Sequence, residues 1–180
     1  MKILAIVGLP GSGKSTAIEA IEDLGTIVTM GDIVRDEAKK RNIEPSGKNL
    51  GKIAKELRKL EGPDVIAKKC VEKISDKKDE IIFIDGIRSL AEVAVFRNIW
   101  EFPIIAIIVD EKKRLKRLLK RARSDDPKKL EEIKERDDRE LQFGLDKVIK
   151  DADFKLKNNS TINDLKKQVR ELVINVLNDY

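Results

Sequence analysis

The chain has 180 residues, 41% of them hydrophobic and 39% charged, and this composition predicts a soluble globular protein with a sizeable core. Its 38 basic and 33 acidic side chains leave a net charge of only +5, so mixed surface ion pairs are expected rather than one uniform basic face. The sequence has no histidine and a single cysteine, which excludes a Ser-His triad, a His-ligated zinc site and an internal disulfide.

Short apolar runs alternate with longer helical patterns along the chain. In chain order, the pattern predicts a strand at 2–7, a helix at 14–24, a strand at 26–29, helices at 32–41, 47–60 and 63–75, a strand at 80–84, a helix at 89–99, a strand at 104–109, helices at about 111–122 and 127–150, an edge strand at 152–157, and a helix at 162–178. Because the strands are apolar on both faces, a parallel sheet with helices on both sides is expected.

The stretch from Gly8 to Ser15, GLPGSGKS, matches the phosphate-binding pattern G-x-x-x-x-G-K-[ST] between a predicted strand and a predicted helix. Its glycines let the backbone turn tightly and aim N–H groups inward, and the helix N-terminus adds partial positive charge. Lys14 is expected to reach the β- and γ-phosphates of ATP, and Ser15 to ligate Mg²⁺. The predicted ATP-binding residues are Gly8, Pro10, Gly11, Ser12, Gly13, Lys14, Ser15 and Thr16.

Two similar elements follow the second and third predicted strands. The residues they offer are Gly31, Asp32 and Arg35 in the first, and Asp85, Gly86 and Arg88 in the second. Because an arginine fork grips phosphate bidentately, the pair predicts a second anionic substrate beside the nucleotide. Asp85 ends an apolar strand and is expected to hold Mg²⁺ through water. Asp32 has two interpretations: it orients the acceptor, or it caps the helix that follows.

A dense run of charged residues covers 111–140, and its part from about 120 to 140 is a candidate lid. A lid arginine that closes over the γ-phosphate neutralises transition-state charge, and Arg123 and Arg136 are the predicted residues. The alternative is a solvated helical hairpin with i,i+4 ion pairs. Beyond the fifth strand, Asn158 is predicted to contact the adenine edge, while Ser160 or Thr161 could simply cap the last helix.

These motifs occur in the order found in nucleoside monophosphate kinases. The strings MGDIVRDEAKKR, DGIRSLAEV and RSDD resemble most an archaeal adenylate-kinase-related group of P-loop kinases, also likened to dephospho-CoA kinases. DGIRS departs from the adenylate kinase pattern, because its arginine comes one residue earlier and the usual proline is missing. The resemblance implies one three-layer α/β P-loop kinase domain over residues 1–180. In it, a five-stranded parallel sheet of order 2-3-1-4-5 carries a small helical lid and acceptor-binding helices at about 32–75.

Three functions are compatible with this pattern. The first is transfer of the γ-phosphoryl of ATP, with Mg²⁺, to a small phosphate-bearing acceptor such as AMP, in which Lys14, Arg88, Arg123 and Arg136 neutralise charge and Arg35 anchors the acceptor. The second is a hydroxyl kinase of the dephospho-CoA kinase type, in which Asp32 acts as the base. The third is a nucleotide-binding regulator or nucleic-acid binder, which the 4% aromatic content disfavours.

The expected surroundings follow from what the sequence lacks. No run approaches the ~20 apolar residues that span a bilayer, so no membrane partner is expected. No signal peptide is visible and the cysteine is alone, which together predict a protein of the reducing cytoplasm. The pattern does not distinguish a monomer from a homo-oligomer.

Overall fold

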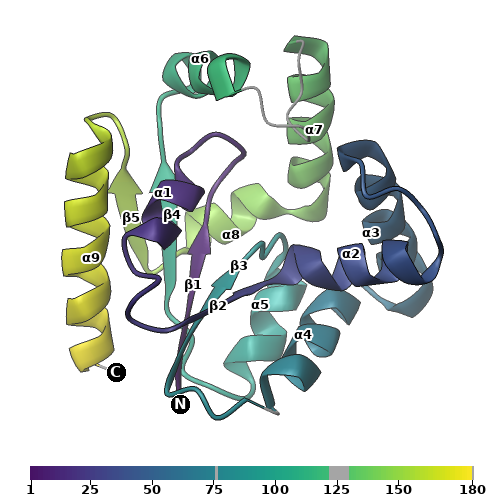
Figure 1. Ribbon diagram of the computed structural model, residues 1–180, viewed down its shortest axis with the longest axis horizontal. Helices are drawn as coiled ribbons and strands as arrows, with labels where there is room; N and C mark the ends of the chain where they lie inside the picture. Colours follow the sequence, from purple (N-terminus) through teal and green to yellow (C-terminus); the bar gives the residue numbers. More distant parts are fainter. Residues whose placement is uncertain (76, 122–129, 180) are drawn as a thin grey trace.

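The computed structural model describes residues 1–75, 77–121 and 130–179 of the chain. At its centre is a parallel sheet built from the strands β1 (Lys2–Val7), β2 (Thr26–Thr29), β3 (Ile81–Asp85), β4 (Ile104–Ile108) and β5 (Phe154–Lys157). The strand order is β2-β3-β1-β4-β5 (Figure 1). The predicted fold class, strand order and edge position of the last strand are therefore confirmed.

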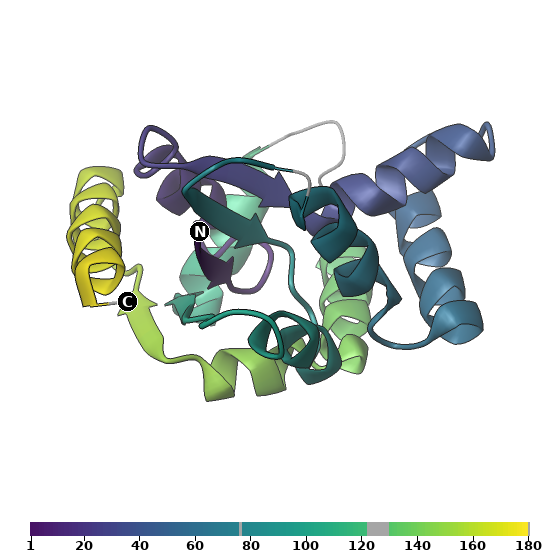
Figure 2. The same ribbon diagram turned by 90° about the horizontal axis from the view of Figure 1, so that it is seen from below.

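Helices cover both faces of the sheet (Figures 1 and 2). One face carries α1 (Lys14–Glu19) and α9 (Ile162–Asp179). The other face carries α2 (Met30–Lys40), α4 (Val65–Ser75), α5 (Leu90–Arg97) and α8 (Leu145–Asp151), and α3 (Gly47–Glu61) packs against α2 and α4 and adds its buried side chains to the same cluster. Two further helices, α6 (Glu111–Arg121) and α7 (Leu130–Phe143), stand beyond the ends to which the strand arrows point (Figure 1).

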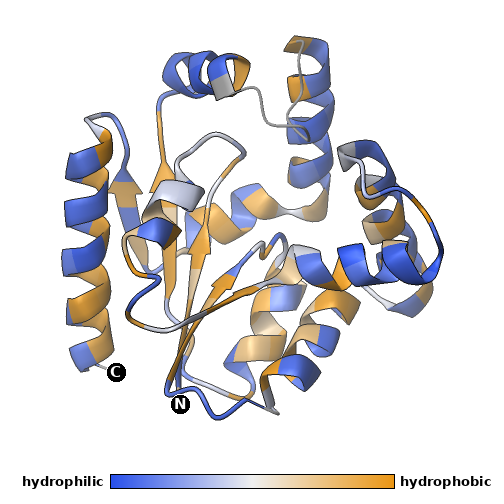
Figure 3. Cartoon of the chain, viewed as in Figure 1, coloured by the Kyte–Doolittle hydropathy of each residue, from blue (hydrophilic) through white to orange (hydrophobic). Residues whose placement is uncertain are grey.

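The core lies on both faces of the sheet, which explains why the strands are apolar throughout. In β1, Ile3, Ala5 and Val7 pack into the larger cluster, whereas Leu4 and Ile6 pack into the smaller one beneath α1 and α9. Figure 3 shows the same contrast, with hydrophobic strands inside and hydrophilic stretches along the outer helices. Burial of these alternating side chains is the main force that holds the layers together.

Two predicted helices differ from the structure. The helix expected at 14–24 ends at Glu19, because the next turns use i→i+3 bonds that let the chain bend toward β2. The helix expected at 127–150 is two helices, α7 and α8, divided at Gly144. Gly144 has φ +99°, a left-handed conformation that glycine adopts without strain, and its peptide redirects the chain. Residues 127–129 lie outside the described ranges.

The strand register brings the carboxyl ends of three strands to one edge. Asp85 at the end of β3 is paired with Thr29 at the end of β2 on one side and with Ile6 of β1 on the other. The loops that follow these strands therefore meet at the edge where open parallel sheets bind ligands. Across the described parts of the chain, no helix has the length and apolar character needed to cross a membrane.

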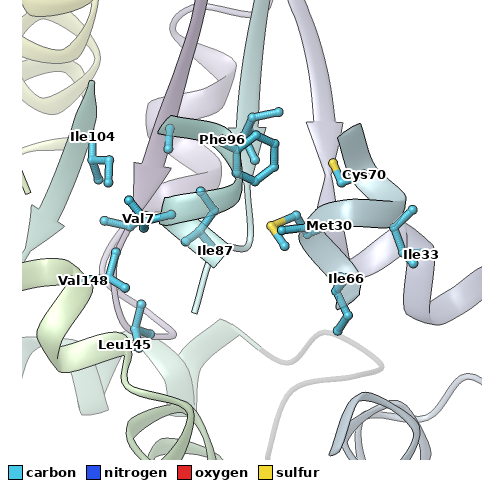
Figure 4. Close-up of a cluster of buried hydrophobic side chains, with 14 of the residues drawn as sticks. Val7, Met30, Ile33, Ile66, Cys70, Ile87, Phe96, Ile104, Leu145 and Val148 are labelled. Carbon is cyan, nitrogen blue, oxygen red and sulfur yellow. The ribbon is translucent and has the colours of Figure 1, made fainter. Parts of the chain in front are cut away.

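Cys70 provides a direct probe of the core. Its side chain is fully buried in the larger cluster, where Met30 and Phe96 also lie (Figure 4). Burial raises the pKa of the Cys70 thiol to about 12, so the native thiol keeps its proton at pH 8. We expect iodoacetamide at pH 8 to alkylate the folded protein about 10³-fold more slowly than the protein in guanidinium chloride, measured by mass spectrometry.

The raised pKa of Cys70 also predicts how the stability of the protein depends on pH. The raised pKa of Cys70 means that the folded state binds the proton more tightly than the unfolded state. This contribution to stability is present below about pH 8.5 and is lost as the pH rises toward 12, and Cys70→Ser should weaken that dependence. In the alkylation experiment described above, equal rates for folded and unfolded protein would contradict the burial of this side chain.

Candidate active site

A cavity of about 210 Å³ opens at the carboxyl edge of the sheet. Its walls come from the loop after β1, the starts of α1 and α2, the loop after β3, and helices α6 to α8. The predicted site residues that line it are Gly8, Pro10, Gly11, Lys14, Ser15, Gly31, Arg35, Asp85, Gly86, Arg88 and Arg136. Folding thus brings together the phosphate-binding loop and both arginine-bearing elements, as the sequence predicted.

The loop after β1 needs its glycines for steric reasons. Gly11 and Gly13 have φ of +79° and +110°, values that other residues rarely adopt. A Cβ atom on Gly8 would stand 2.5 Å from the carbonyl oxygen of Ile107, and one on Gly13 would stand 2.2 Å from Nδ2 of Asn158. The backbone therefore reaches this conformation only without side chains at these positions.

Lys14 lies at the centre of the loop that it follows. Its Nζ donates hydrogen bonds to the carbonyl oxygens of Gly8, at 2.6 Å, and Leu9, at 3.4 Å. Burial lowers the pKa of the Lys14 ammonium, and the carboxylates of Asp85 and Glu140 oppose that shift. The ammonium is thus a charge held in a partly desolvated cavity, where its attraction for phosphate oxygens is stronger than in water.

The donor set at the end of β3 fits a hydrated Mg²⁺. Oδ1 of Asp85 is buried and makes no hydrogen bond within the described residues, and burial raises the pKa of this carboxyl. Ser15 lines the same cavity. The described residues contain no cluster of three His, Cys, Asp or Glu that could hold a metal by itself. A single carboxylate, a hydroxyl, water and phosphate oxygens are the ligands with which Mg²⁺ commonly binds nucleotides.

Arg88 is held from two sides. Its Nε donates to Oε2 of Glu140 on α7, at 2.7 Å, and its backbone N–H donates to Oε2 of Glu92, at 2.8 Å. Glu92 is fully buried and also accepts from Nη2 of Arg58, at 2.6 Å, whose guanidinium lies over the ring of Phe143. The loop after β3 is therefore fixed by charge-assisted hydrogen bonds to α3, α5 and α7.

Arg35 and Asp32 form a pair at the start of α2. Nη1 of Arg35 donates to Oδ1 of Asp32 at 2.6 Å, and both side chains are at least half exposed. Arg35 lines the cavity, but Asp32 is not among the lining residues. Thr29, not Asp32, stands at the N-cap position of α2, although no side-chain hydrogen bond caps that end. The Asp32 carboxylate therefore lies in the first turn of α2, where it interacts favourably with the positive end of the helix dipole and orients Arg35.

A second cavity, of about 530 Å³, adjoins the first. The two share the lining residues Gly31, Arg35, Arg88, Arg136 and Glu140, and the second extends toward Lys48 and Gly51 of α3 and Arg139 of α7. Figure 1 shows α7 standing between α6 and α3 above this edge of the sheet. The wall between the cavities thus carries three arginines and one buried carboxylate, Glu140.

Helices α6 and α7 are joined to the phosphate-binding loop by a buried ion pair. Arg114 of α6 donates to both carboxylate oxygens of Asp137 of α7, at 3.0 and 2.5 Å, and to the carbonyl oxygen of Pro10, at 3.1 Å. Arg136, a predicted lid arginine, lines both cavities. Arg123, the other predicted lid arginine, lies outside the described residues.

The remaining predicted residues lie behind the loop. Asn158 is buried, and its Nδ2 donates to the carbonyl oxygen of Ser12 at 2.7 Å, so the side chain supports the loop and does not line the first cavity. Ser12 is buried with an Oγ that makes no hydrogen bond among the described residues. Thr16 is half-buried in α1.

Thr161, rather than Ser160, caps α9, because its Oγ1 accepts from the backbone N–H of Asp164.

Several residues of this site were not among the predictions. Glu92 carried a visible signal, since Ser89 and Glu92 have the spacing of a capping box, and Ser89 does accept from the N–H of Glu92. Gly51 carried a weaker signal, because a glycine inside a predicted helix can mark a place where another group packs closely. The roles of Arg58, Arg114, Asp137, Arg139 and Glu140 depend on helix packing, and their lysine- and glutamate-rich surroundings offered no local signal.

Comparisons with known proteins agree with this arrangement. Residues 7–134 match the AAA domain family. The chain is 44% identical over 179 residues to the UPF0200/UPF0201 protein of Archaeoglobus fulgidus, in an alignment that covers 97% of this chain and 55% of that protein. The chain thus spans about half of that relative. It is 41% identical over 180 residues to a UPF0200 protein of Methanosarcina barkeri, where the coverage is 98% of this chain and 97% of the relative.

The fold has solved counterparts among P-loop kinases. The structure of shikimate kinase from Acinetobacter baumannii in complex with shikimate aligns with a TM-score of 0.60 at 13% identity, covering 97% of this chain and 94% of that one. At this identity the likeness shows the fold alone. The predicted resemblance to an archaeal group of P-loop kinases is confirmed at the level of the family: the chain belongs to the AAA domain family and, among its archaeal relatives, to the UPF0200 proteins.

Proposed function

We propose that the protein is an ATP-dependent phosphotransferase that moves the γ-phosphoryl group to a small phosphate-bearing acceptor. The observation that carries this proposal is the wall shared by two adjoining cavities, which contains Arg35, Arg88 and Arg136. The first cavity has the size and lining for a polyphosphate chain, and the second has room for another molecule. An arginine-rich junction between them is suited to hold two phosphates whose mutual repulsion must be overcome.

The nucleotide side follows from the phosphate-binding loop. Lys14, which donates to the carbonyls of Gly8 and Leu9, would exchange those contacts for phosphate oxygens of ATP. Ser15 and Asp85 would hold Mg²⁺, and Asp85 would do so through water. A bound Mg²⁺ supplies charge neutralisation and orientation of the phosphate chain. Asn158 would act indirectly, by fixing the carbonyl of Ser12 and so the path of the loop.

The acceptor side follows from the paired arginines. Arg35 would anchor the acceptor phosphate, Arg88 and Arg136 would neutralise the transferring group, and AMP is the first candidate acceptor. A phosphate acceptor is already ionised near neutral pH, so no strong base is needed. The position of Asp32 supports this version, because its carboxylate is exposed and engaged by Arg35. Residues 1–180 would then form one catalytic domain, with α2 to α4 on the acceptor side and the lid between about 120 and 140.

The first experiment screens acceptors. We expect ADP release from Mg²⁺-ATP to require one of a panel of nucleoside monophosphates, dephospho-CoA and small alcohols, and to be greatest with a monophosphate. Lys14→Ala removes the cation in the nucleotide cavity and should lower the rate by about 10²–10³-fold. Binding of single-stranded nucleic acid with a steep salt dependence, and no acceptor-dependent ADP release, would instead favour a nucleic-acid-binding protein.

The role of Asp32 separates a phosphate acceptor from a hydroxyl acceptor. With a phosphate acceptor, we expect Asp32→Asn to keep kcat within about threefold of the wild-type value, since no proton has to be removed. A hydroxyl kinase that uses Asp32 as its base should lose about 10²–10⁴-fold in kcat. Steady-state kinetics with the acceptor found in the screen gives the answer, and the larger loss would overturn the phosphate-acceptor version.

The ion pair between α6 and α7 should support both stability and ATP binding. Asp137→Ala leaves Arg114 buried without its partner, and we expect the free energy of unfolding to fall by about 3 kcal/mol. The KM for ATP should rise, because Arg114 also holds the carbonyl of Pro10. Asp138→Ala is the matched control. Asp138 is the exposed neighbour of Asp137, so this substitution should change the free energy of unfolding by less than about 0.5 kcal/mol. Equal effects of the two substitutions in urea unfolding would contradict this role.

A further inference from the structure

The far part of the second cavity is not shared with the nucleotide cavity. It is lined by α3 and α7, through Lys48, Leu50, Gly51, Glu132, Glu135 and Arg139. The shared wall is where two reacting phosphates would meet, so the far part would receive the remainder of the acceptor. No aromatic side chain lines this cavity within the described part of the chain, so charge rather than ring stacking would supply the affinity there.

Arg139 is the dominant cation in that far part. Its side chain is half-buried, and no hydrogen bond or ion pair connects it to another described residue. Burial lowers the pKa of its guanidinium, Glu140 and Glu135 oppose this, and Arg88 and Arg136 add to it. Glu140 is already hydrogen-bonded to Arg88. A partly desolvated guanidinium without a bound carboxylate is a strong receptor for an anion.

Gly51 leaves room for this guanidinium on the surface of α3. A Cβ atom at position 51 would stand 2.7 Å from Nη1 of Arg139 and 2.8 Å from its Cζ. Glycine inside a helix is less favourable than alanine, so α3 carries a residue that is locally suboptimal. Helix α3 thus has a residue of low helix propensity at a position that the guanidinium of Arg139 approaches closely.

We propose that Arg139 and Lys48 form a second anion subsite, and that the acceptor therefore carries a second anionic group besides the phosphate that receives the γ-phosphoryl. This inference rests on the proposed phosphotransfer. The second group is a phosphate or a carboxylate, both of which match the arginine fork. Glu132 and Glu135 also line this part, but they are exposed, as Lys48 is, and water and salt screen all three charges. The half-buried guanidinium of Arg139 is therefore the charge on which the subsite mainly depends, and Lys48 stands at its exposed rim.

Matched pairs of compounds test the subsite. Adenosine 3′,5′-bisphosphate is compared with AMP, and 3-phosphoglycerate with glycerol 3-phosphate, by calorimetric titration in the presence of Mg²⁺ and a non-hydrolysable ATP analogue. We expect the compound with two anionic groups to bind about 10- to 100-fold more tightly in at least one pair. The first pair reports a second phosphate and the second pair a carboxylate.

Substitutions then locate the preference. Arg139→Gln and Gly51→Ala should both reduce it to less than about twofold, the second because the new methyl group displaces the guanidinium. Gly51→Ala should leave Tm unchanged or raise it by ~2–4 °C, since alanine favours the helix, so lost binding cannot be attributed to lost folding. Lys134→Gln, on the exposed surface of α7, removes a charge of the same sign and should keep the preference.

Three outcomes would overturn the subsite: equal binding within both pairs, no binding of any of the four compounds, or a preference that survives in both variants. The proposed function is measured separately, through ADP release with the same compounds. A preference without ADP release would support the subsite and contradict phosphotransfer. ADP release with AMP and no preference in either pair would support phosphotransfer and contradict the subsite.

Discussion

The loop after β3 and the helices that line the second cavity depend on one buried carboxylate, that of Glu92. It accepts hydrogen bonds from the backbone of Arg88 and from the side chain of Arg58, and so ties the loop after β3 to helix α3. Arg58 lies over Phe143 at the end of α7, and the side chain of Arg88 reaches Glu140 on the same helix. Three helices that are distant in sequence are therefore oriented around a single charge, which is stable when buried because its partners satisfy it.

The charged side chains around the first cavity partly balance one another. Lys14, Arg35, Arg88 and Arg136 lie around one cavity, and their mutual repulsion opposes folding. Asp85 and Glu140 offset part of that charge without filling the cavity. The result is a site that is positive enough to attract polyanions and yet compatible with a compact fold. The opposing pKa shifts of Lys14, which burial lowers, and Asp85, which burial raises, have the same origin in the partly desolvated edge of the sheet.

The sequence allowed the sheet and the centre of the site to be predicted because their signals are local. Apolar runs marked the strands, GLPGSGKS marked the phosphate-binding loop, and the rule that parallel strands present their carboxyl ends together placed Arg35 and Arg88 near Lys14. The supporting pairs could not be predicted in this way. Arg114 and Asp137 are 23 residues apart on two charged helices with many equivalent candidates, and only the packing of those helices selects the pair.

The break at Gly144 has a geometric consequence for α7. This helix has 14 residues, so it is a rod about 21 Å long whose C-terminal end leads through Gly144 into α8. A rotation of about 10° at that end would displace Leu130 by nearly 4 Å but Arg139 by little more than about 1 Å. The ion pairs of Glu140 and Asp137 lie on the C-terminal half of α7, next to α8. Arginines on that half would keep their register with the sheet while the opposite tip of the rod swept a much larger arc.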